Sequence, residues 1–291
     1  MRFYIVDAFT DKAFGGNTAG VVLIENGESF PDEIFMQNLA AELRYSETAF
    51  ITQNNESEFT TRYFTPEGEV DLCGHATISA FHVLEKENFI EKGKTYLNHT
   101  KAGNLKIILN ESVFMQMAQV KDLGTLEEKA ELADLYAIMG IDYKKKDFPF
   151  LPKIISTGLP DILLPLRGRE ELNLMKPDMN ALSSLSGKMN VVGVHAFALD
   201  SSGKYSAFVR NFAPLYGINE EAATGTSNGA LTYWLYCNGL ISEETECLFL
   251  QGETMKRPSE IRTRLDIKEN CCNIWVGGKC KILACGNLIL D

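Results

Sequence analysis

The sequence predicts an α+β protein made of two similar halves. Two observations support this fold class. Short strand-like apolar runs alternate with segments of helical spacing along the whole chain, and motifs of the first half return in the same order in the second half. The length of 291 residues fits one large domain or two of roughly 140 residues each. With 45% hydrophobic residues, the chain has ample material for a core.

The elements follow from local patterns. Pro31 precedes apolar residues at helical spacing up to Leu43, and two further helices open beside Gly74 and Gly225. The expected helices are 31–43, 74–84, 126–139, 170–186 and 226–237. The expected strands are 2–9, 20–24, 48–52, 58–64, 94–99, 104–109, 112–118, 162–166, 191–199 and 205–212, with a strand-rich tail from 247.

The internal repeat defines the two halves. Gly16-Asn17 corresponds to Gly158-Leu159, the segment 47–50 to 194–197, Arg62-Tyr-Phe-Thr-Pro66 to Arg210-Asn-Phe-Ala-Pro214, and Gly74 to Gly225. The offsets of 142, 147, 148 and 151 residues keep one order and drift only by small insertions. The expected halves are 1–120, completed by a C-terminal strand 281–291, and 121–280.

Charge and cysteine content exclude several classes of protein. The chain carries 28 Lys and Arg against 39 Asp and Glu, a net charge of −11, which argues against binding nucleic acid or an anionic membrane. The sequence predicts no secretory signal and no membrane span. Seven cysteines without a C-x-x-C pair indicate reduced thiols in a cytoplasmic protein and no zinc site.

Two helices that begin at glycines predict an anion site. In a duplicated fold, Gly74 and Gly225 would bring two helix N-termini toward one cleft between the halves. Each N-terminus offers unpaired N–H groups and a partial positive charge, and glycine lets a ligand approach closely. An acidic protein could therefore hold a small carboxylate substrate without a basic patch.

Several motifs resemble the phenazine-biosynthesis-like (PhzF) family. They are Gly15-Gly-Asn17, Ser46-Glu-Thr48, Phe64-x-Pro66, Asp71-Leu-Cys-Gly-His-Ala-Thr77 and Glu220-Glu-Ala-Ala-Thr-Gly-Thr226. The resemblance implies the diaminopimelate-epimerase-like fold, in which a mixed or antiparallel sheet wraps round a central helix in each half. It also implies an isomerase that needs no cofactor or metal, and it alone suggests a homodimer.

The resemblance assigns the acid/base role to Glu47. Its counterpart in the repeat is taken as Val194, which would leave one carboxylate facing an apolar wall. Carboxyl groups beside apolar surfaces titrate nearer neutrality, as a proton shuttle requires. His75, at the start of its helix, is expected to position substrate or relay protons. The alternatives are a solvated or capping Glu47 and a His75 that only caps backbone groups.

Other matched positions carry weaker expectations. The family usually has Asp where this chain has Glu221 and Ser where it has Thr226, and both residues also suit an ordinary helix start. Gly16 and Asn17 lie where the family binds substrate, although Gly-Gly-Asn is also a common turn. Cys73 precedes the first helix but Thr224 precedes the second, so a two-thiol racemase mechanism lacks its second base. Cys73 is therefore interpreted as a packing residue.

The sequence thus predicts an isomerase that moves a proton within a small carboxylic acid and shifts a double bond. Glu47, His75 and Glu221 would be catalytic, and Gly16, Asn17, Gly74, Gly225 and Thr226 would bind substrate. Two alternatives stay open: an amino-acid epimerase or racemase, and a non-catalytic small-anion binder of the same fold.

Overall fold

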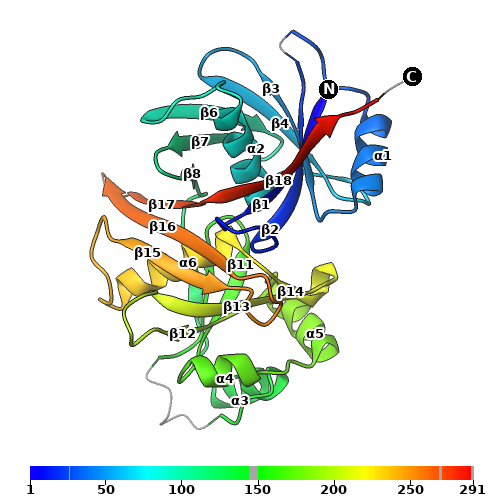
Figure 1. Ribbon diagram of the computed structural model, residues 1–291. Coiled ribbons are helices and arrows are strands. Elements are labelled where there is room, and N and C mark those ends of the chain that lie inside the picture. The colour runs from blue at the N-terminus through cyan, green and yellow to red at the C-terminus, as the bar shows by residue number, and fades with distance from the viewer. Residues whose placement is uncertain (26, 144–149, 269–270, 290–291) are drawn as a thin grey trace. The chain divides into compact units, whose positions relative to one another are not determined.

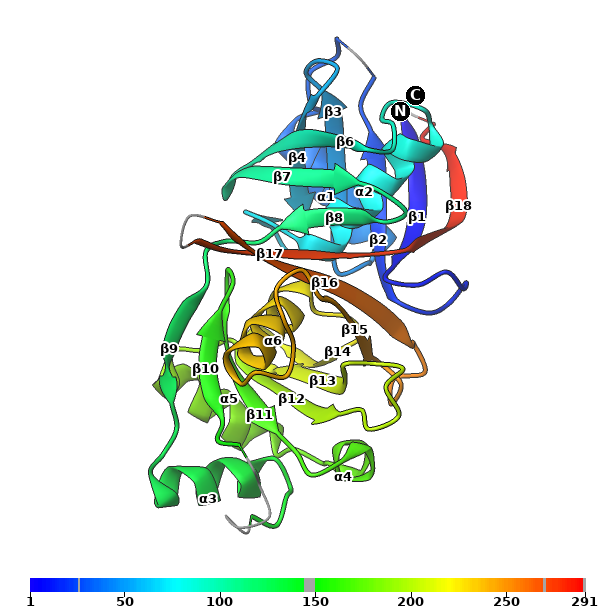
Figure 2. The same cartoon turned by 90° about the vertical axis from the view of Figure 1, so that its left-hand side faces the viewer.

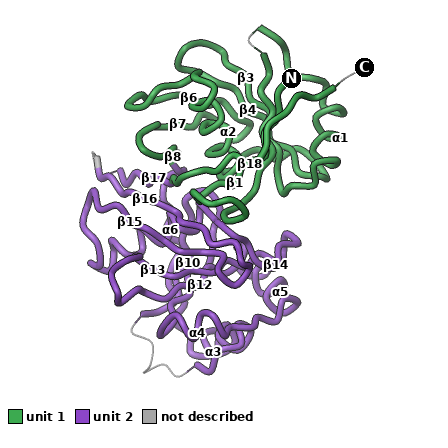
Figure 3. The backbone as a smooth tube through the Cα atoms, in the orientation of Figure 1, with its two compact units in different colours: residues 1–116, 277–291 green, residues 117–276 purple. Residues whose placement is uncertain are grey.

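The computed structural model describes residues 1–25, 27–143, 150–268 and 271–289. The chain forms two compact units, drawn in different colours in Figure 3. Unit 1 comprises 1–116 and 277–291, and unit 2 comprises 117–276. These boundaries lie four residues before the expected ones, and the C-terminal strand belongs to the first unit.

Unit 1 is a mixed sheet with one enclosed helix. Its strands are β1 (Arg2–Ala8), β2 (Asn17–Leu23), β3 (Thr48–Gln53), β4 (Glu58–Phe64), β5 (Glu69–Val70), β6 (Lys94–Thr100), β7 (Gly103–Leu109), β8 (Val113–Gln116) and β18 (Cys280–Asn287). β1 pairs antiparallel with β18 and β2, while β2–β3 and β4–β6 are parallel. The pairs β3–β4, β6–β7 and β7–β8 are antiparallel.

The enclosed helix α2 (Gly74–Lys86) forms the core of unit 1. It packs against β1, β2, β3, β8 and β18 (Figure 1). Most of its residues are buried, including small ones such as Ala76 and Ala80, so the sheet can approach it from several sides. A second helix, α1 (Glu33–Leu43), lies against β3 and β4 and buries Met36 and Ala40.

Unit 2 repeats this arrangement. Its strands are β9 (Lys121–Thr125), β10 (Lys153–Ser156), β11 (Pro160–Pro165), β12 (Gly193–Leu199), β13 (Ala207–Ala213), β14 (Ile218–Glu221), β15 (Glu246–Gln251), β16 (Ser259–Lys268) and β17 (Cys271–Gly278), the last two residues of which belong to unit 1. β11–β12 and β13–β15 are parallel; β9–β10, β10–β11, β12–β13 and β15–β16 are antiparallel.

The helix α6 (Gly225–Cys237) occupies the centre of unit 2, where it packs against β10, β11 and β16 (Figure 2). Three further helices are α3 (Lys129–Ile138), α4 (Arg169–Leu174) and α5 (Met179–Met189). The helix expected over 170–186 is two helices. Pro177 separates them, because proline has no backbone N–H to donate and its ring clashes with the preceding helical turn. None of the helices in the described ranges has the length and apolar character needed to cross a membrane.

Strand register corrects one element of the repeat. Thr48 pairs with Phe64 across β3–β4, and Val194 pairs with Phe212 across β12–β13. The phenylalanines belong to the repeated Arg-x-Phe-x-Pro motif, so Val194 corresponds to Thr48 and the counterpart of Glu47 is Gly193. The expected pairing of Glu47 with Val194 is wrong by one residue, which in a strand changes the face to which a side chain points.

The Arg-x-Phe-x-Pro motif has the same structural role in both units. Arg62 makes two hydrogen bonds to the carboxylate of Glu69, and Arg210 makes two to that of Glu220. Each guanidinium also lies over the ring of the motif's phenylalanine, at 5.3 and 4.9 Å from the ring centre. Residues i and i+2 of a strand share a face, which explains why the arginine and phenylalanine recur together.

Candidate functional site

The carboxylate of Glu47 lies beside the start of α2. Glu47 directly precedes β3, and its backbone carbonyl accepts a hydrogen bond from the N–H of Gly20 at 3.1 Å. Its Oε2 is 3.2 Å from Nε2 of His75. Among the described residues, no group makes an aligned hydrogen bond to this buried oxygen. The side chain as a whole is 20% exposed, so part of Glu47 reaches solvent although Oε2 itself is buried.

Four side chains surround the ring of His75. Asn17 Nδ2 and Cys73 Sγ each lie 3.3 Å from Nδ1, and Ser46 Oγ lies 3.2 Å from Nε2. Glu47 is the fourth, also on the Nε2 side. Burial lowers the pKa of His75, opposed by the charge of Glu47 and by a hydrogen bond with the Thr18 backbone. The imidazole is therefore neutral near pH 7, with its ring fixed from both edges.

The loop that carries Asn17 is fixed by a buried carboxylate. Asp7 accepts hydrogen bonds from the Thr18 hydroxyl at 2.6 Å and the Phe14 N–H at 2.9 Å. Gly16 has φ = 63°, and a Cβ there would lie 2.0 Å from the Ala8 carbonyl oxygen, so only glycine fits. Gly16 thus shapes the turn that presents Asn17 to His75.

The first turn of α2 is available to an anion. Cys73 is the N-cap residue and makes no side-chain capping bond, and α2, which is described throughout, has no acidic residue in its first turn. A Cβ on Gly74 would meet nothing nearer than Met115 Cε at 3.5 Å, so the protein itself does not require glycine there. The unpaired N–H groups of this turn favour a carboxylate.

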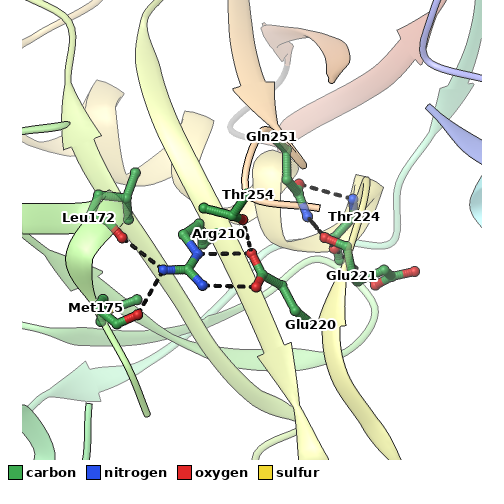
Figure 4. Close-up of polar contacts among 8 residues, drawn as sticks. All are labelled: Leu172, Met175, Arg210, Glu220, Glu221, Thr224, Gln251 and Thr254. Carbon is green, nitrogen blue, oxygen red and sulfur yellow. Dashed lines mark hydrogen bonds and ion pairs between the residues drawn. The ribbon is translucent and has the colours of Figure 1, made fainter. Parts of the chain in front are cut away.

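In unit 2, Glu221 belongs to a polar cluster at the start of α6 (Figure 4). Its Oε2 accepts a hydrogen bond from the Thr224 hydroxyl at 2.9 Å, and its carbonyl accepts one from Gln251 Nε2 at 2.8 Å. Gln251 Oε1 also accepts the Thr224 N–H, at 3.1 Å. Thr226 is the second residue of α6, after Gly225, and its carbonyl accepts a hydrogen bond from the Thr157 hydroxyl.

Sequence reasoning missed a buried polar network below the start of α6. Asp161 accepts hydrogen bonds from Ser227 and Asn211, and Asn211 Nδ2 also lies 3.3 Å from His195 Nδ1. All four side chains are at most 2% exposed. Burial raises the pKa of Asp161 and lowers that of His195 to about 3. The network is closed to solvent. Its side chains contact one another, but Asp161 Oδ1 and His195 Nε2 have no hydrogen-bond partner among the described residues.

The predicted residues therefore divide between the units. In unit 1 the structure brings Asn17, Glu47 and His75 together, with Gly16 and Gly74 in the turns that position them. In unit 2, Glu221, Gly225 and Thr226 lie together at the start of α6. Ser46 and Gln251 are additional members. Ser46 stands in the motif Ser46-Glu-Thr48, but no role was predicted for it, and Gln251 lies outside every matched motif.

Comparison with known proteins identifies the relatives of this chain. A family model described as "Phenazine biosynthesis-like protein" matches residues 6–285. A protein of Escherichia coli K12 named "Uncharacterized isomerase YddE" is 33% identical over 281 residues, covering 92% of this chain and 91% of the relative.

Solved structures share the fold. A PhzF-family phenazine biosynthesis protein from Bacillus anthracis superposes with a TM-score of 0.85 at 24% identity, covering 100% of this chain and 99% of the other. A protein from Pseudomonas aeruginosa described as a predicted epimerase superposes with a TM-score of 0.78 at 23% identity, with the same coverage. The expected epimerase-like α+β fold is confirmed.

Proposed function

The chain belongs to the phenazine biosynthesis-like (PhzC-PhzF) family, whose curated relatives are named isomerases, and we propose that it shifts a proton within a small carboxylic acid without a cofactor. Glu47 removes a proton from one carbon and returns it to another on the same face of the substrate, so that a double bond moves. The observation that carries this proposal is the position of Glu47 Oε2, buried beside His75 without an aligned hydrogen bond from the described residues.

The start of α2 supports the choice of a carboxylate substrate. Its N–H groups belong to the same first turn as His75 and carry the positive end of the helix dipole. Charge that develops on the substrate carboxylate as the proton leaves would be stabilised there. His75 is a positioning residue for Glu47, since its Nε2 is 3.2 Å from the carboxylate while its other edge is held by Asn17.

The principal test is proton exchange in D₂O. A panel of small unsaturated carboxylic acids is incubated with the protein, and deuterium incorporation and double-bond position are followed by proton NMR. We expect Glu47→Gln to lower the rate by at least about 10³-fold, within the range known for acid/base groups. Glu42→Gln, an exposed acid of α1, is the control and should leave the rate unchanged. A Glu47→Gln rate within tenfold of the natural protein would remove Glu47 as the base.

A second test asks whether the start of α2 holds the substrate. Gly74→Ala creates no clash inside the protein, because the nearest atom would be 3.5 Å from the new methyl group. We expect unchanged thermal unfolding but a KM raised at least about tenfold, because the methyl would displace the bound carboxylate. An unchanged KM would place the carboxylate elsewhere.

The two rival functions give different results in the same assay. An epimerase would exchange the proton at Cα without moving a double bond, and its rate would depend on Cys73, which contacts His75. A non-catalytic binder would bind carboxylates without exchanging any proton.

Participation of Glu221 stays a prediction with its own test. In Glu221→Gln, slower exchange with unchanged thermal unfolding would support a role in catalysis. Lower stability with an unchanged exchange rate would restrict this carboxylate to its hydrogen bond with Thr224.

A further inference from the structure

Three side chains with metal-binding atoms converge at the start of α2. They are Glu47, Cys73 and His75, and one ligating atom from each lies within 4.8 Å of the others. The sequence predicted no metal site, because Glu47 is far from the Cys-Gly-His segment in the chain and no C-x-x-C pair occurs. The fold brings them together by placing the residue before β3 next to the first turn of α2.

Two ligand–ligand distances are close to the edges of a tetrahedral zinc site, and the third atom pair lies within 4.8 Å. Zinc bonds of about 2.05 Å to nitrogen or oxygen and about 2.3 Å to sulfur give ligand–ligand edges of about 3.3 Å for N···O and about 3.6 Å for N···S. His75 Nε2 lies 3.2 Å from Glu47 Oε2 and 3.9 Å from Cys73 Sγ. Small side-chain rotations would bring the three atoms onto one ion.

The donor set and its surroundings favour a particular class of cation. A thiolate, an imidazole and a carboxylate together suit Zn²⁺ and not Mg²⁺ or Ca²⁺, which prefer oxygen ligands only. With Nε2 on the metal, Nδ1 keeps its proton and needs an acceptor; the ring already bonds to the Thr18 backbone, and the Asn17 amide beside Nδ1 would have to turn its oxygen toward it. Such outer contacts orient a metal-binding histidine.

We propose that Glu47, Cys73 and His75 form a binding site for Zn²⁺ with one coordination position left open. On binding, the Cys73 thiol loses its proton to solvent, and the sulfur, the imidazole nitrogen and a carboxylate oxygen bond to the ion. Because the metal occupies the Glu47 oxygen that is proposed to move protons, Zn²⁺ and turnover exclude each other. The inference shares residues with the proposed function but rests on the arrangement of ligands, not on turnover.

The test uses Co²⁺ as a spectroscopic substitute for Zn²⁺ in the full-length protein. Cys237 and Cys272 influence each other electrostatically and could offer a second thiol site, so both are first replaced by Ser. We expect one equivalent of Co²⁺ to produce a sulfur-to-cobalt charge-transfer band and visible bands of tetrahedral cobalt. One equivalent of Zn²⁺ should then abolish both.

Two variants test the cysteine and glutamate ligands, and a third is the control. Cys73→Ser should lose the charge-transfer band; Ser is a favoured N-cap residue, so α2 should still form. Glu47→Gln should weaken Co²⁺ binding at least about tenfold. Cys285→Ser, which removes an exposed thiol, is the matched control and should keep the spectrum. Absence of the band, or its persistence in Cys73→Ser, would overturn the proposal.

These outcomes are independent of catalysis. The cobalt spectrum requires no turnover, whereas the exchange assay is run with a chelator present. A missing band with active enzyme would reject only the metal site, and a band without any proton exchange would reject only the proposed reaction.

Discussion

The two units differ in whether the carboxylate that accompanies the buried histidine reaches solvent. In unit 1, Glu47 and His75 lie at the start of the central helix, and the Glu47 side chain is 20% exposed. In unit 2, Asp161 and His195 lie below the start of the equivalent helix and are fully enclosed. Unit 1 therefore joins its histidine to a carboxylate that reaches solvent, whereas the histidine of unit 2 belongs to an enclosed network and the half-buried carboxylate there is Glu221.

Strand register shows which residues of unit 1 stand at the positions of the buried polar network of unit 2. Asp161, His195 and Asn211 correspond to Ala19, Ala49 and Tyr63 of unit 1. In unit 1 the single ring of Tyr63 fills this space, and its hydroxyl bonds to Thr77 and Asn98. Unit 2 fills it with several smaller polar groups. This network is enclosed but incomplete, because Asp161 Oδ1 and His195 Nε2 have no hydrogen-bond partner among the described residues.

The largest effect is expected where unit 2 has lost the counterpart of Glu47. A Cβ on Gly193 would lie 1.8 Å from the carbonyl oxygen of Phe212, so the strand must move to accept any side chain. We expect Gly193→Ala to lower the free energy of unfolding by at least about 3 kcal/mol in urea titrations. The control is Gly187→Ala in α5, where the new methyl meets only Leu215 at 3.9 Å and should be neutral or slightly stabilising.

That result decides whether unit 2 could hold a carboxylate at the position of Glu47. If Gly193→Ala were as stable as the natural protein, the backbone there would tolerate side chains. The functional difference between the units would then lie in sequence alone.

A smaller difference is expected between the two arginine–glutamate pairs. Arg210 is 10% exposed and also donates to the carbonyls of Leu172 and Met175 (Figure 4), whereas Arg62 is 24% exposed. Replacing Arg210 by Met leaves these two carbonyls without their hydrogen-bond donor. We expect it to lower the free energy of unfolding by between about 2 and 3 kcal/mol. Arg62→Met should cost about 1 kcal/mol, since Lys101 still pairs with Glu69.

Chemical denaturation of the two variants under identical conditions measures this ranking. Equal losses would mean that the backbone acceptors of Arg210 contribute nothing, and that the two pairs are equivalent despite their different burial.

The enclosed histidine of unit 2 predicts a pH dependence of stability. Burial lowers the pKa of His195 to about 3 from 6.5, so the folded protein keeps the ring neutral while the unfolded chain binds a proton below pH 6.5. The stability due to His195 is complete above pH 6.5 and falls by up to about 1.4 kcal/mol per pH unit as the pH decreases toward 3. Asp161, whose pKa is raised, acts in the opposite direction.

Unfolding free energies of the natural protein and His195→Ala, measured from pH 7 to pH 4, isolate this effect. The stability difference between them should shrink as the pH falls. His99→Ala, which removes a histidine that is 33% exposed, serves as the control. Parallel curves for the natural protein and His195→Ala would show that His195 does not titrate on unfolding.

The sequence predicted the fold well because the repeat is visible in residues with strong local meaning. Glycines at helix starts and the Arg-x-Phe-x-Pro motif reappear in order, and both have structural causes in the two units. The alignment of Glu47 with Val194 was wrong because a match of four residues does not reveal a shift of one residue at the start of a strand. Only the pairing of Val194 with Phe212 reveals it.

The site was predictable to the extent that its residues lie in short motifs. Glu47, His75 and Asn17 each lie in one of the short motifs, and the fold of unit 1 brings these motifs together around His75. Gln251 could not be assigned, since a lone glutamine at the end of a strand has no distinctive pattern. The contact of Cys73 with His75 also escaped prediction, because it depends on side-chain direction within one helical turn and not on spacing.

The smallest predicted effect concerns the ends of two equivalent helices. α1 and α5 each begin at a capping aspartate, and each ends at a residue in the left-handed region, Arg44 (φ 58°) in unit 1 and Asn190 (φ 54°) in unit 2. Asparagine tolerates this conformation better than arginine. We expect Arg44→Asn to raise the free energy of unfolding by about 0.5 kcal/mol, and Asn190→Arg to lower it by a similar amount. Thermal unfolding of both variants measures these two changes in stability. Changes in the same direction would mean that side-chain contacts outweigh the backbone preference.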